Sequence, residues 1–192
     1  KGLTREAVAH MRLFISGSAP LLPETFSEFR ERTGQTLLER YGMTEGGMFT
    51  SNPLEGERRG GTVGFPLPGV GLRVRDDKGQ PLPAGEIGHI EVKGPNVFQG
   101  YWRMPEKTAE EFTPDGWFKT GDVGKIDEQG VVTIVGRSKD LVITGGYNVY
   151  PAEIEGTIND MPGVAESAVV GVPHPDFGEG VIAMVVPKPG AS

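Results

Sequence analysis

The sequence predicts a mixed α/β fold, and three observations indicate it. Residues 1–62 contain a strand, a helix and a strand within about thirty residues, the length of a parallel βαβ unit. Residues 63–138 alternate apolar and polar side chains over short runs between glycine turns, as antiparallel strands do. Residues 139–192 combine a helix that begins at a proline with valine-rich strands, which predicts a small α/β lobe.

The first part begins with a predicted buried strand at Arg12–Ile15, which is a short apolar run before a turn. Pro23 favours a helix start because its fixed φ suits the first helical position. Gly34 favours the helix end, since glycine adopts the left-handed conformation that follows many helices. A second strand is expected from Thr36 into Tyr41.

The remaining elements follow from the same signals. In the β-rich part, strands are expected at Leu72–Arg75, Ile87–Val92 and Gly130–Val135, with a short helix at Pro105–Phe112. Lys139–Asp140 marks the predicted start of the last lobe. Its expected elements are a strand at Leu141–Ile143, a turn at Gly145–Gly146, a helix from Pro151 with Ile154, Ile158 and Met161 on one face, and strands at Ser167–Val172 and Val181–Val186.

Composition excludes several classes of function. The net charge of −7 argues against a general nucleic-acid surface, which needs clustered Lys and Arg. With no cysteine there is neither a disulfide framework nor a thiol nucleophile. No apolar run approaches the roughly 20 residues that span a bilayer, and no signal-peptide pattern opens the chain. We therefore expect a cytoplasmic protein without a membrane span.

Two stretches carry polar groups that could serve a nucleotide. Ser16–Pro20 places small side chains just past a strand end, where backbone can approach a flat ring closely, although an ordinary turn explains it too. Tyr41–Glu45 offers an aromatic ring for stacking, a hydroxyl for a phosphate and a carboxylate for Mg²⁺. The alternative for the second stretch is a surface turn with a solvated glutamate.

Three later features are weaker signals by themselves. Thr120–Asp122 offers a carboxylate after a glycine turn, which can accept hydrogen bonds from the two hydroxyls of a ribose, although such turns are common. Arg137 could bond the same ribose or a phosphate, or form a surface salt bridge. Gly145–Gly146 predicts a hairpin turn that also permits close approach of an extended chain such as a pantetheine arm.

Five stretches stand in the order found in one enzyme superfamily. They are Ser16–Pro20, Tyr41–Glu45, Gly85–Tyr101, Thr120–Asp122 and Gly136–Asp140. Together they resemble the core motifs of the adenylate-forming acyl-CoA synthetases, and the resemblance covers essentially the whole chain. The stretches most similar to the malonate-activating members are Asn52–Pro53, Val92–Phe98, Tyr101–Thr108 and Val172–Glu179.

The resemblance implies ligation of a small carboxylic acid, with malonate favoured, to CoA in two steps. An acyl-adenylate and pyrophosphate form first from the acid and Mg-ATP, and the CoA thiol then displaces AMP. The implied cofactors are ATP, Mg²⁺ and CoA, and the implied partner is the small carboxylate.

The resemblance also implies site residues by position. The ATP-binding set would be Ser18, Ala19, Pro20, Glu39, Arg40, Tyr41, Gly42, Met43, Asp122, Ile134 and Arg137. Thr44 would contact phosphate, and Glu45 would hold Mg²⁺. Asp122 and Arg137 would bind the ribose, with Ile134 packing nearby.

Three further roles follow in the same way. Ser16 and Met43 would line the acyl pocket. Lys139 matches the hinge at which the C-terminal lobe turns between the two half-reactions. The CoA tunnel would be faced by Gly145, Gly146 and Tyr147.

The departures from the family pattern imply an interior segment. The glycine-rich phosphate loop with its lysine and the catalytic lysine near the family's C-terminus are both missing from these 192 residues. The chain thus resembles the end of a large N-terminal domain (residues 1–138) followed by a truncated, mobile C-terminal lobe (residues 139–192). Malonate needs a cation for its second carboxylate, expected upstream of Lys1, with Arg40 the nearby candidate here.

Three alternatives stay open at this point. The protein could be a CoA ligase for another aliphatic or aryl acid, or an adenylation domain that loads a carrier protein. The chain by itself could also be a non-catalytic module that retains part of an AMP site, and we expect the 192-residue segment alone to be inactive.

Overall fold

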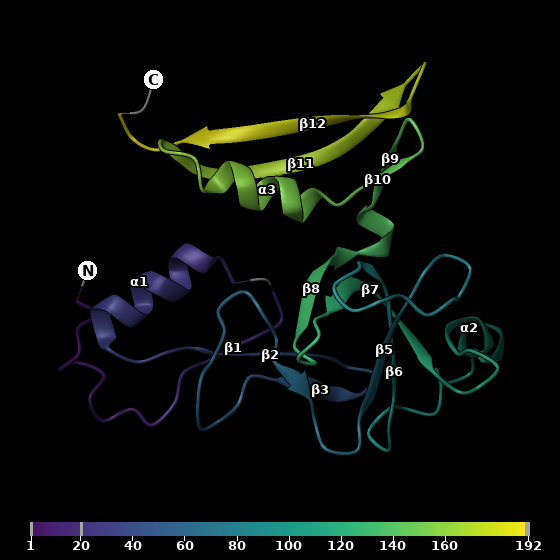
Figure 1. Ribbon diagram of the computed structural model, residues 1–192, viewed down its shortest axis with the longest axis horizontal. Coiled ribbons are helices and arrows are strands. Elements are labelled where there is room, and N and C mark those ends of the chain that lie inside the picture. The colour runs from purple at the N-terminus through teal and green to yellow at the C-terminus, as the bar shows by residue number, and fades with distance from the viewer. Residues whose placement is uncertain (1, 20, 191–192) are drawn as a thin grey trace. The chain divides into compact units, whose positions relative to one another are not determined.

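The computed structural model describes residues 2–19 and 21–190 and confirms the mixed α/β class (Figure 1). Its contacts divide it into two compact units. The first unit comprises Lys1–Thr120 and Gly124–Ile134, and the second comprises Gly121–Val123 and Val135–Ser192. No helix within the described part is long and apolar enough to cross a membrane.

The first unit opens with the predicted βαβ order. Its elements are β1 (Ile15–Ser16), α1 (Pro23–Thr33), β2 (Leu38–Met43), β3 (Gly47–Ser51) and β4 (Phe65–Pro66), in a sheet of order β1-β2-β3-β4. Strands β1 and β2 are parallel, and β3 and β4 continue antiparallel. The predicted buried strand at Arg12–Ile15 is wrong in extent and burial. Strand β1 keeps only Ile15–Ser16, and Ile15 is 48% exposed because β1 is the edge of this sheet.

Helix α1 begins and ends where its sequence signals stand. Pro23 occupies the first turn, where its missing N–H costs no hydrogen bond. Gly34 follows the last turn with φ of 70°, and its N–H donates to the Arg30 carbonyl at 2.8 Å. The inward face buries Phe26, and Gly60 leaves room for its ring, since a Cβ there would lie 2.7 Å from the Phe26 Cδ1 atom.

A second sheet contains β5 (Gly71–Arg75), β6 (Gly88–Lys93), β7 (Phe118–Ile126) and β8 (Val132–Arg137) in that order, with α2 (Pro105–Glu111) between β6 and β7. Here one prediction is wrong, because Asp122 does not follow a glycine turn: Thr120–Asp122 lies inside β7. Phe118, Thr120 and Asp122 alternate onto a buried face, which is the pattern of a strand. Gly121 has φ of 74°, so the turn-like backbone is confined to one residue.

The core of the first unit gathers residues from both sheets. Phe49, Ile90, Val92 and Phe118 are at most 1% exposed and form one cluster, called here the Phe49 cluster. Partly buried side chains that pack against it include Tyr41, Met43, Val97, Phe98, Phe112 and Ile134. Burial of these large apolar groups is the main stabilising term for the unit.

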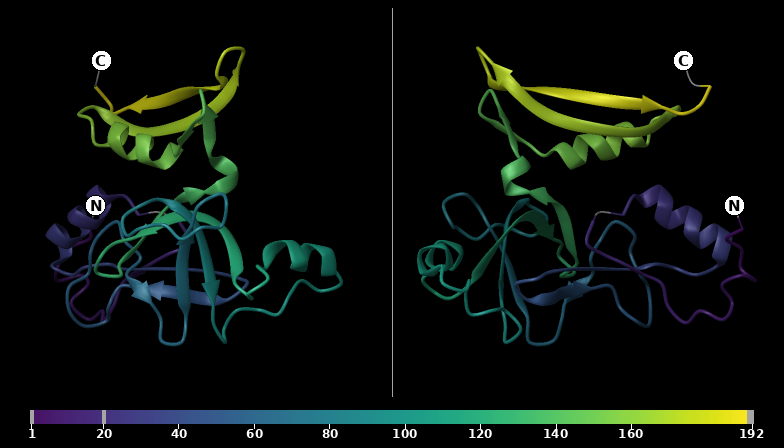
Figure 2. Two further views of the ribbon diagram at one scale, coloured as in Figure 1. Left: turned by 45° about the vertical axis from the view of Figure 1, so that its right-hand side comes forward. Right: turned by 180° about the vertical axis from the view of Figure 1, so that it is seen from behind.

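The second unit is built around one antiparallel sheet. Its elements are the 3-10 helix η1 (Ser138–Asp140), β9 (Val142–Thr144), β10 (Tyr147–Val149), α3 (Pro151–Asn159), β11 (Val164–His174) and β12 (Gly178–Pro187). The sheet order is β10-β9-β12-β11, and α3 lies along β11 (Figures 1 and 2). The predicted helical face extends too far, because Met161 lies two residues beyond the end of α3 and is 50% exposed.

Candidate active site

A tight turn at Thr44–Gly46 joins β2 to β3. The backbones of the two strands approach each other closely at Gly42, where an added Cβ would lie 1.9 Å from the Gly47 carbonyl oxygen. No side chain can be placed there without moving backbone, so glycine is required before the turn. The register also shifts between Tyr41 and Gly42, which bends the strand as it enters the turn.

Residues from a later segment hold this turn in place. The Asn96 side-chain amide donates to the Gly46 carbonyl at 2.7 Å, and the Phe98 N–H donates to the Glu45 carbonyl at 2.7 Å. The Tyr101 hydroxyl donates to Glu45 Oε1 at 3.0 Å. Sequence reasoning assigned no role to these three residues. The available signal was their position in the stretches that carry the family resemblance.

The turn presents two of the predicted functional groups. Thr44 is exposed, and Glu45 is half-buried and accepts the Tyr101 hydrogen bond. Burial, together with the hydrogen bond to Glu45, raises the pKa of Tyr101 to about 12. Tyr101 therefore stays protonated near neutral pH and can act only as a donor toward Glu45 in this contact.

Three predicted residues from distant parts of the sequence pack on the Phe49 cluster. Tyr41 and Met43 come from β2, and Ile134 comes from β8. The Tyr41 and Phe49 ring centroids lie 5.7 Å apart in a tilted arrangement. This packing orients the Tyr41 ring, because aromatic pairs have preferred geometries.

Glu39 lies at the buried start of β2 and is 6% exposed. Its Oε1 accepts a hydrogen bond from the Gly61 N–H at 2.9 Å, so the carboxylate faces the 52–62 loop in this structure. Burial raises the pKa of Glu39, and the Gly61 N–H offsets part of that shift. The predicted adenine contact of Glu39 stays a prediction.

We expect Glu39→Gln to change the pH dependence of stability. A carboxyl group with a raised folded-state pKa lowers stability as the pH rises, because the unfolded chain ionises first, near the ordinary Glu pKa of about 4.3. Between about pH 4 and 7 the wild-type free energy of unfolding should therefore fall relative to that of Glu39→Gln, whose amide oxygen still accepts from Gly61. Urea unfolding of both proteins across this range measures the difference. A constant difference would contradict the prediction.

The strand end at Ser16–Ala19 adjoins β2. Ser16 is half-buried, and Ser18 and Ala19 are exposed. Ser18 has φ of 70°, which is uncommon for a residue with a side chain and is found often at binding sites. An added Cβ on Gly17 would lie 3.2 Å from the Arg40 carbonyl oxygen, so these segments touch. Pro20 of the predicted set lies outside the described residues.

In the second unit, Asp122 and Arg137 form an ion pair. The Arg137 Nε atom lies 2.9 Å from Asp122 Oδ1. The Asp122 side chain is 6% exposed and that of Arg137 is 51% exposed. Ser138 donates its hydroxyl to the Gly121 carbonyl at 2.8 Å, which ties the two segments together beside the pair. Two predicted residues fifteen positions apart are thus in direct contact.

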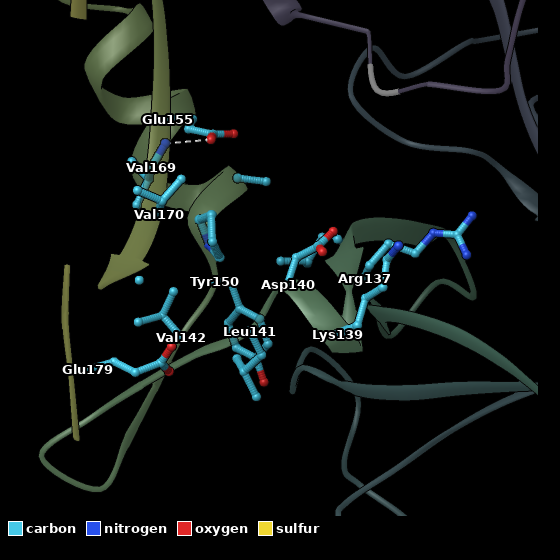
Figure 3. Close-up of a pocket in the computed structure, with 15 residues that line it drawn as sticks. Arg137, Lys139, Asp140, Leu141, Val142, Tyr150, Glu155, Val169, Val170 and Glu179 are labelled. Atoms are coloured by element: carbon cyan, nitrogen blue, oxygen red, sulfur yellow. Dashed lines mark hydrogen bonds between the residues drawn. The ribbon is translucent and has the colours of Figure 1, made fainter. Parts of the chain in front are cut away.

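A pocket of about 440 Å³ lies within the second unit (Figure 3). Arg137 and Lys139 line one end, and Glu155 and Val169 line another. Lys139 belongs to η1 and is exposed, so its backbone torsions are not constrained by a side chain packed in a core. Its predicted hinge role stays a prediction.

Gly145 and Gly146 form the two-residue turn of the β9–β10 hairpin. Their φ values are 56° and 84°, and two positive values are characteristic of a type I′ turn, the tight turn that matches strand twist. Tyr147 follows at the start of β10 and is 77% exposed. The predicted hairpin is present, and these three residues are adjacent at its tip.

The described ranges contain no group of three His, Cys, Asp or Glu side chains that could hold a metal ion. Mg²⁺ in nucleotide enzymes needs only one or two protein carboxylates, because the phosphates supply other ligands. The single carboxylate of Glu45, which follows Thr44 in the chain, fits that donor set.

The chain matches two family models. Residues 2–102 match the AMP-binding enzyme model, and residues 153–192 match the AMP-binding enzyme C-terminal domain. The first match alone covers more than half of the chain.

Comparison with individual known proteins also finds similarity to CoA ligases. A malonate–CoA ligase of Arabidopsis thaliana is 46% identical over 186 residues, which are 96% of this chain and 30% of the relative. A sulfoacetate–CoA ligase of Cupriavidus necator is 43% identical over 188 residues, which are 97% of this chain and 37% of the relative. The crystal structure of ATP-bound MatB from Rhodopseudomonas palustris is 66% identical with a TM-score of 0.95, covering 99% of this chain and 38% of that one. The chain spans about a third of the length of these relatives, and it belongs to the AMP-binding enzyme family.

Proposed function

We propose that the full-length protein joins a small carboxylic acid, malonate, to CoA through an acyl-adenylate, with release of AMP and pyrophosphate. The observation that carries the proposal is the Thr44–Gly46 turn. It carries a hydroxyl and a carboxylate at consecutive positions and is held by three residues from another segment. Family membership and the CoA ligase names of the relatives support the same reaction.

We assign the phosphate end of ATP to this turn. The exposed Thr44 hydroxyl donates to a phosphate oxygen, and Glu45 supplies a carboxylate for Mg²⁺. When bound, Mg²⁺ neutralises charge on the phosphates. Tyr101 keeps one Glu45 oxygen oriented through its hydrogen bond, so the second oxygen has a defined direction.

We assign the ribose to Asp122 and Arg137. The buried Asp122 carboxylate can accept bonds from both ribose hydroxyls, and the guanidinium of Arg137 lies beside it at 2.9 Å. We assign the adenine to the small side chains of Ser18 and Ala19 and to the Tyr41 ring, whose face can stack on a purine. The remaining members of the adenine set, by the same resemblance, are Pro20, Glu39, Arg40, Gly42, Met43 and Ile134.

The reaction then has two steps. A carboxylate oxygen of the acid attacks the α-phosphorus, the bond to the bridging oxygen of pyrophosphate breaks, and an acyl-adenylate forms. The sulfur of CoA next attacks the acyl carbon, and AMP leaves with the bonding electron pair. We assign the hinge between these steps to Lys139 and the CoA contact to Gly145, Gly146 and Tyr147, which lie at an exposed hairpin tip.

The choice of malonate rests on the relatives and on charge. Malonate and sulfoacetate, named for the two relatives, both carry a second anionic group. Burying that group without a cation would cost several kcal/mol. Ser16 and Met43 are the proposed walls of the acid site, and the cation for the second carboxylate is expected upstream of Lys1. Within this chain the nearby candidate is Arg40, whose side-chain stem lies 3.7 Å from an added Cβ on Gly17.

Pyrophosphate exchange with a panel of acids tests the proposal. We expect the full-length protein to exchange labelled pyrophosphate into ATP with malonate at a kcat/KM about 100-fold above that with acetate, because acetate lacks the second charged contact. Methylmalonate, sulfoacetate and benzoate complete the panel. Preference for another acid would retain the ligase and contradict malonate. Silence with every acid would contradict adenylation itself.

A further inference from the structure

The start of β12 and the turn before it contact the β9–β10 hairpin through a short ladder. The register between β9 and β12 contains one residue pair, Gly178 with Thr144. Two hydrogen bonds flank that pair. The Gly145 N–H donates to the Phe177 carbonyl at 2.9 Å, and the Ile143 N–H donates to Glu179 Oε2 at 2.8 Å.

Glu179 supplies a side-chain acceptor where the β9–β12 ladder is short. A hydrogen bond from an N–H to an ionised carboxylate is stronger than one to a neutral carbonyl. Figure 3 shows Glu179 extending from β12 toward Val142. Its other oxygen occupies space left by Gly171, since an added Cβ there would lie 2.7 Å from Glu179 Oε1.

The hairpin needs this support because it is small. Strands β9 and β10 have three residues each, and an isolated two-stranded hairpin is marginally stable in water. Ile143 is 52% exposed and Tyr147 is 77% exposed, so core packing contributes little at these positions. A binding surface made of backbone must be held to within about 0.5 Å to be effective.

We propose that Glu179 is a positioning residue that holds the β9–β10 hairpin for the thioester-forming step, without contacting CoA itself. The inference rests on the proposed function in taking Gly145–Tyr147 as the CoA-contacting segment. It assigns a role to Glu179, the last residue of the Val172–Glu179 stretch, for which the sequence had indicated no role.

A matched pair of variants distinguishes this positioning role from a general loss of stability in the second unit. Glu155 makes the same kind of bond elsewhere in the unit, where its Oε1 accepts from the Val169 N–H at 2.8 Å. In the full-length protein, Glu179→Ala should raise amide hydrogen exchange at Ile143 about tenfold and leave Val169 unchanged. Glu155→Ala should do the reverse.

The kinetic test follows the two half-reactions separately. We expect Glu179→Ala to slow thioester formation about tenfold and raise the KM for CoA, with pyrophosphate exchange unchanged. Glu179→Gln should retain most of the rate, because its amide oxygen accepts the same bond. Glu155→Ala should not change the ratio of the two half-reaction rates.

The outcomes distinguish this inference from the proposed function. An Ile143 amide that exchanges equally in wild type and Glu179→Ala overturns the positioning role. So does an equal loss of both half-reactions, or a loss of neither. If the wild type adenylates no acid, the proposed function fails and the thioester part of the inference fails with it. Ile143 exchange still decides in that case whether Glu179 holds the hairpin.

Discussion

Asp122→Ala should lower the kcat/KM for ATP in adenylate formation about 100-fold. The estimate follows from two lost hydrogen bonds between a carboxylate and ribose hydroxyls, each worth about 1.5 kcal/mol or more in a buried setting. Asp122 is 4% exposed, so water cannot readily replace the missing oxygen atoms. Pyrophosphate exchange with the favoured acid measures the loss.

A second nucleotide makes this prediction specific to the ribose. Wild type should prefer ATP over 2′-deoxy-ATP by about tenfold, because one of the two bonded hydroxyls is missing from the analogue. In Asp122→Ala this preference should collapse toward one, whereas a merely destabilised enzyme would keep it. Asp77→Ala is the control for removal of a carboxylate elsewhere, since the exposed Asp77 Oδ1 atom lies 2.7 Å from His89 Nε2. An unchanged preference in Asp122→Ala would contradict the ribose assignment.

Gly146→Trp should block thioester formation while sparing adenylate formation. An added Cβ on Gly146 meets no atom within 4 Å, so a side chain can start there without a clash at its first atom. If the tip contacts CoA, the indole occupies that space, and we expect the second half-reaction to fall at least 100-fold. Single-turnover conversion of a preformed acyl-adenylate measures it, with pyrophosphate exchange as the reference.

Backbone strain must be separated from blockage in this experiment. Gly146 has φ of 84°, which costs a residue with a side chain about 1–2 kcal/mol. Gly79→Trp carries the same kind of strain at φ of 74° and also has open space around it, so it should leave both half-reactions intact. Gly146→Asn, with a residue that tolerates positive φ, should retain more activity than the tryptophan variant. Survival of both steps in Gly146→Trp would make the CoA assignment wrong.

The sequence by itself determined those helix ends and turns that depend on a single proline or glycine. Pro23 and Gly34 bound α1, and two glycines form the β9–β10 turn, because fixed or left-handed φ values belong to these residues. Alternating polarity determined β5 and β6 and their antiparallel pairing. The family also followed from sequence, since the motif order resembles it and the family models match.

Other features depended on contacts between distant segments. Strand β3 was not predicted, because Gly47–Ser51 contains a buried Phe49 but no alternation long enough to signal a strand. The strand state of Thr120–Asp122 was missed because glycine before aspartate is a common turn signal. Within β7 the Thr120 hydroxyl donates to the buried Ile90 carbonyl at 2.9 Å, a contact thirty residues away that local sequence cannot show.

For the candidate site too, the sequence indicated some features and only the tertiary structure showed the others. Residue types and order were enough to select Thr44, Glu45, Asp122 and Arg137, because each carries a group suited to a nucleotide. Only the tertiary structure showed that Asp122 pairs with Arg137 and that Tyr101 holds Glu45. Such pairings depend on strand register and on loop paths, which bring together side chains that no sequence spacing relates.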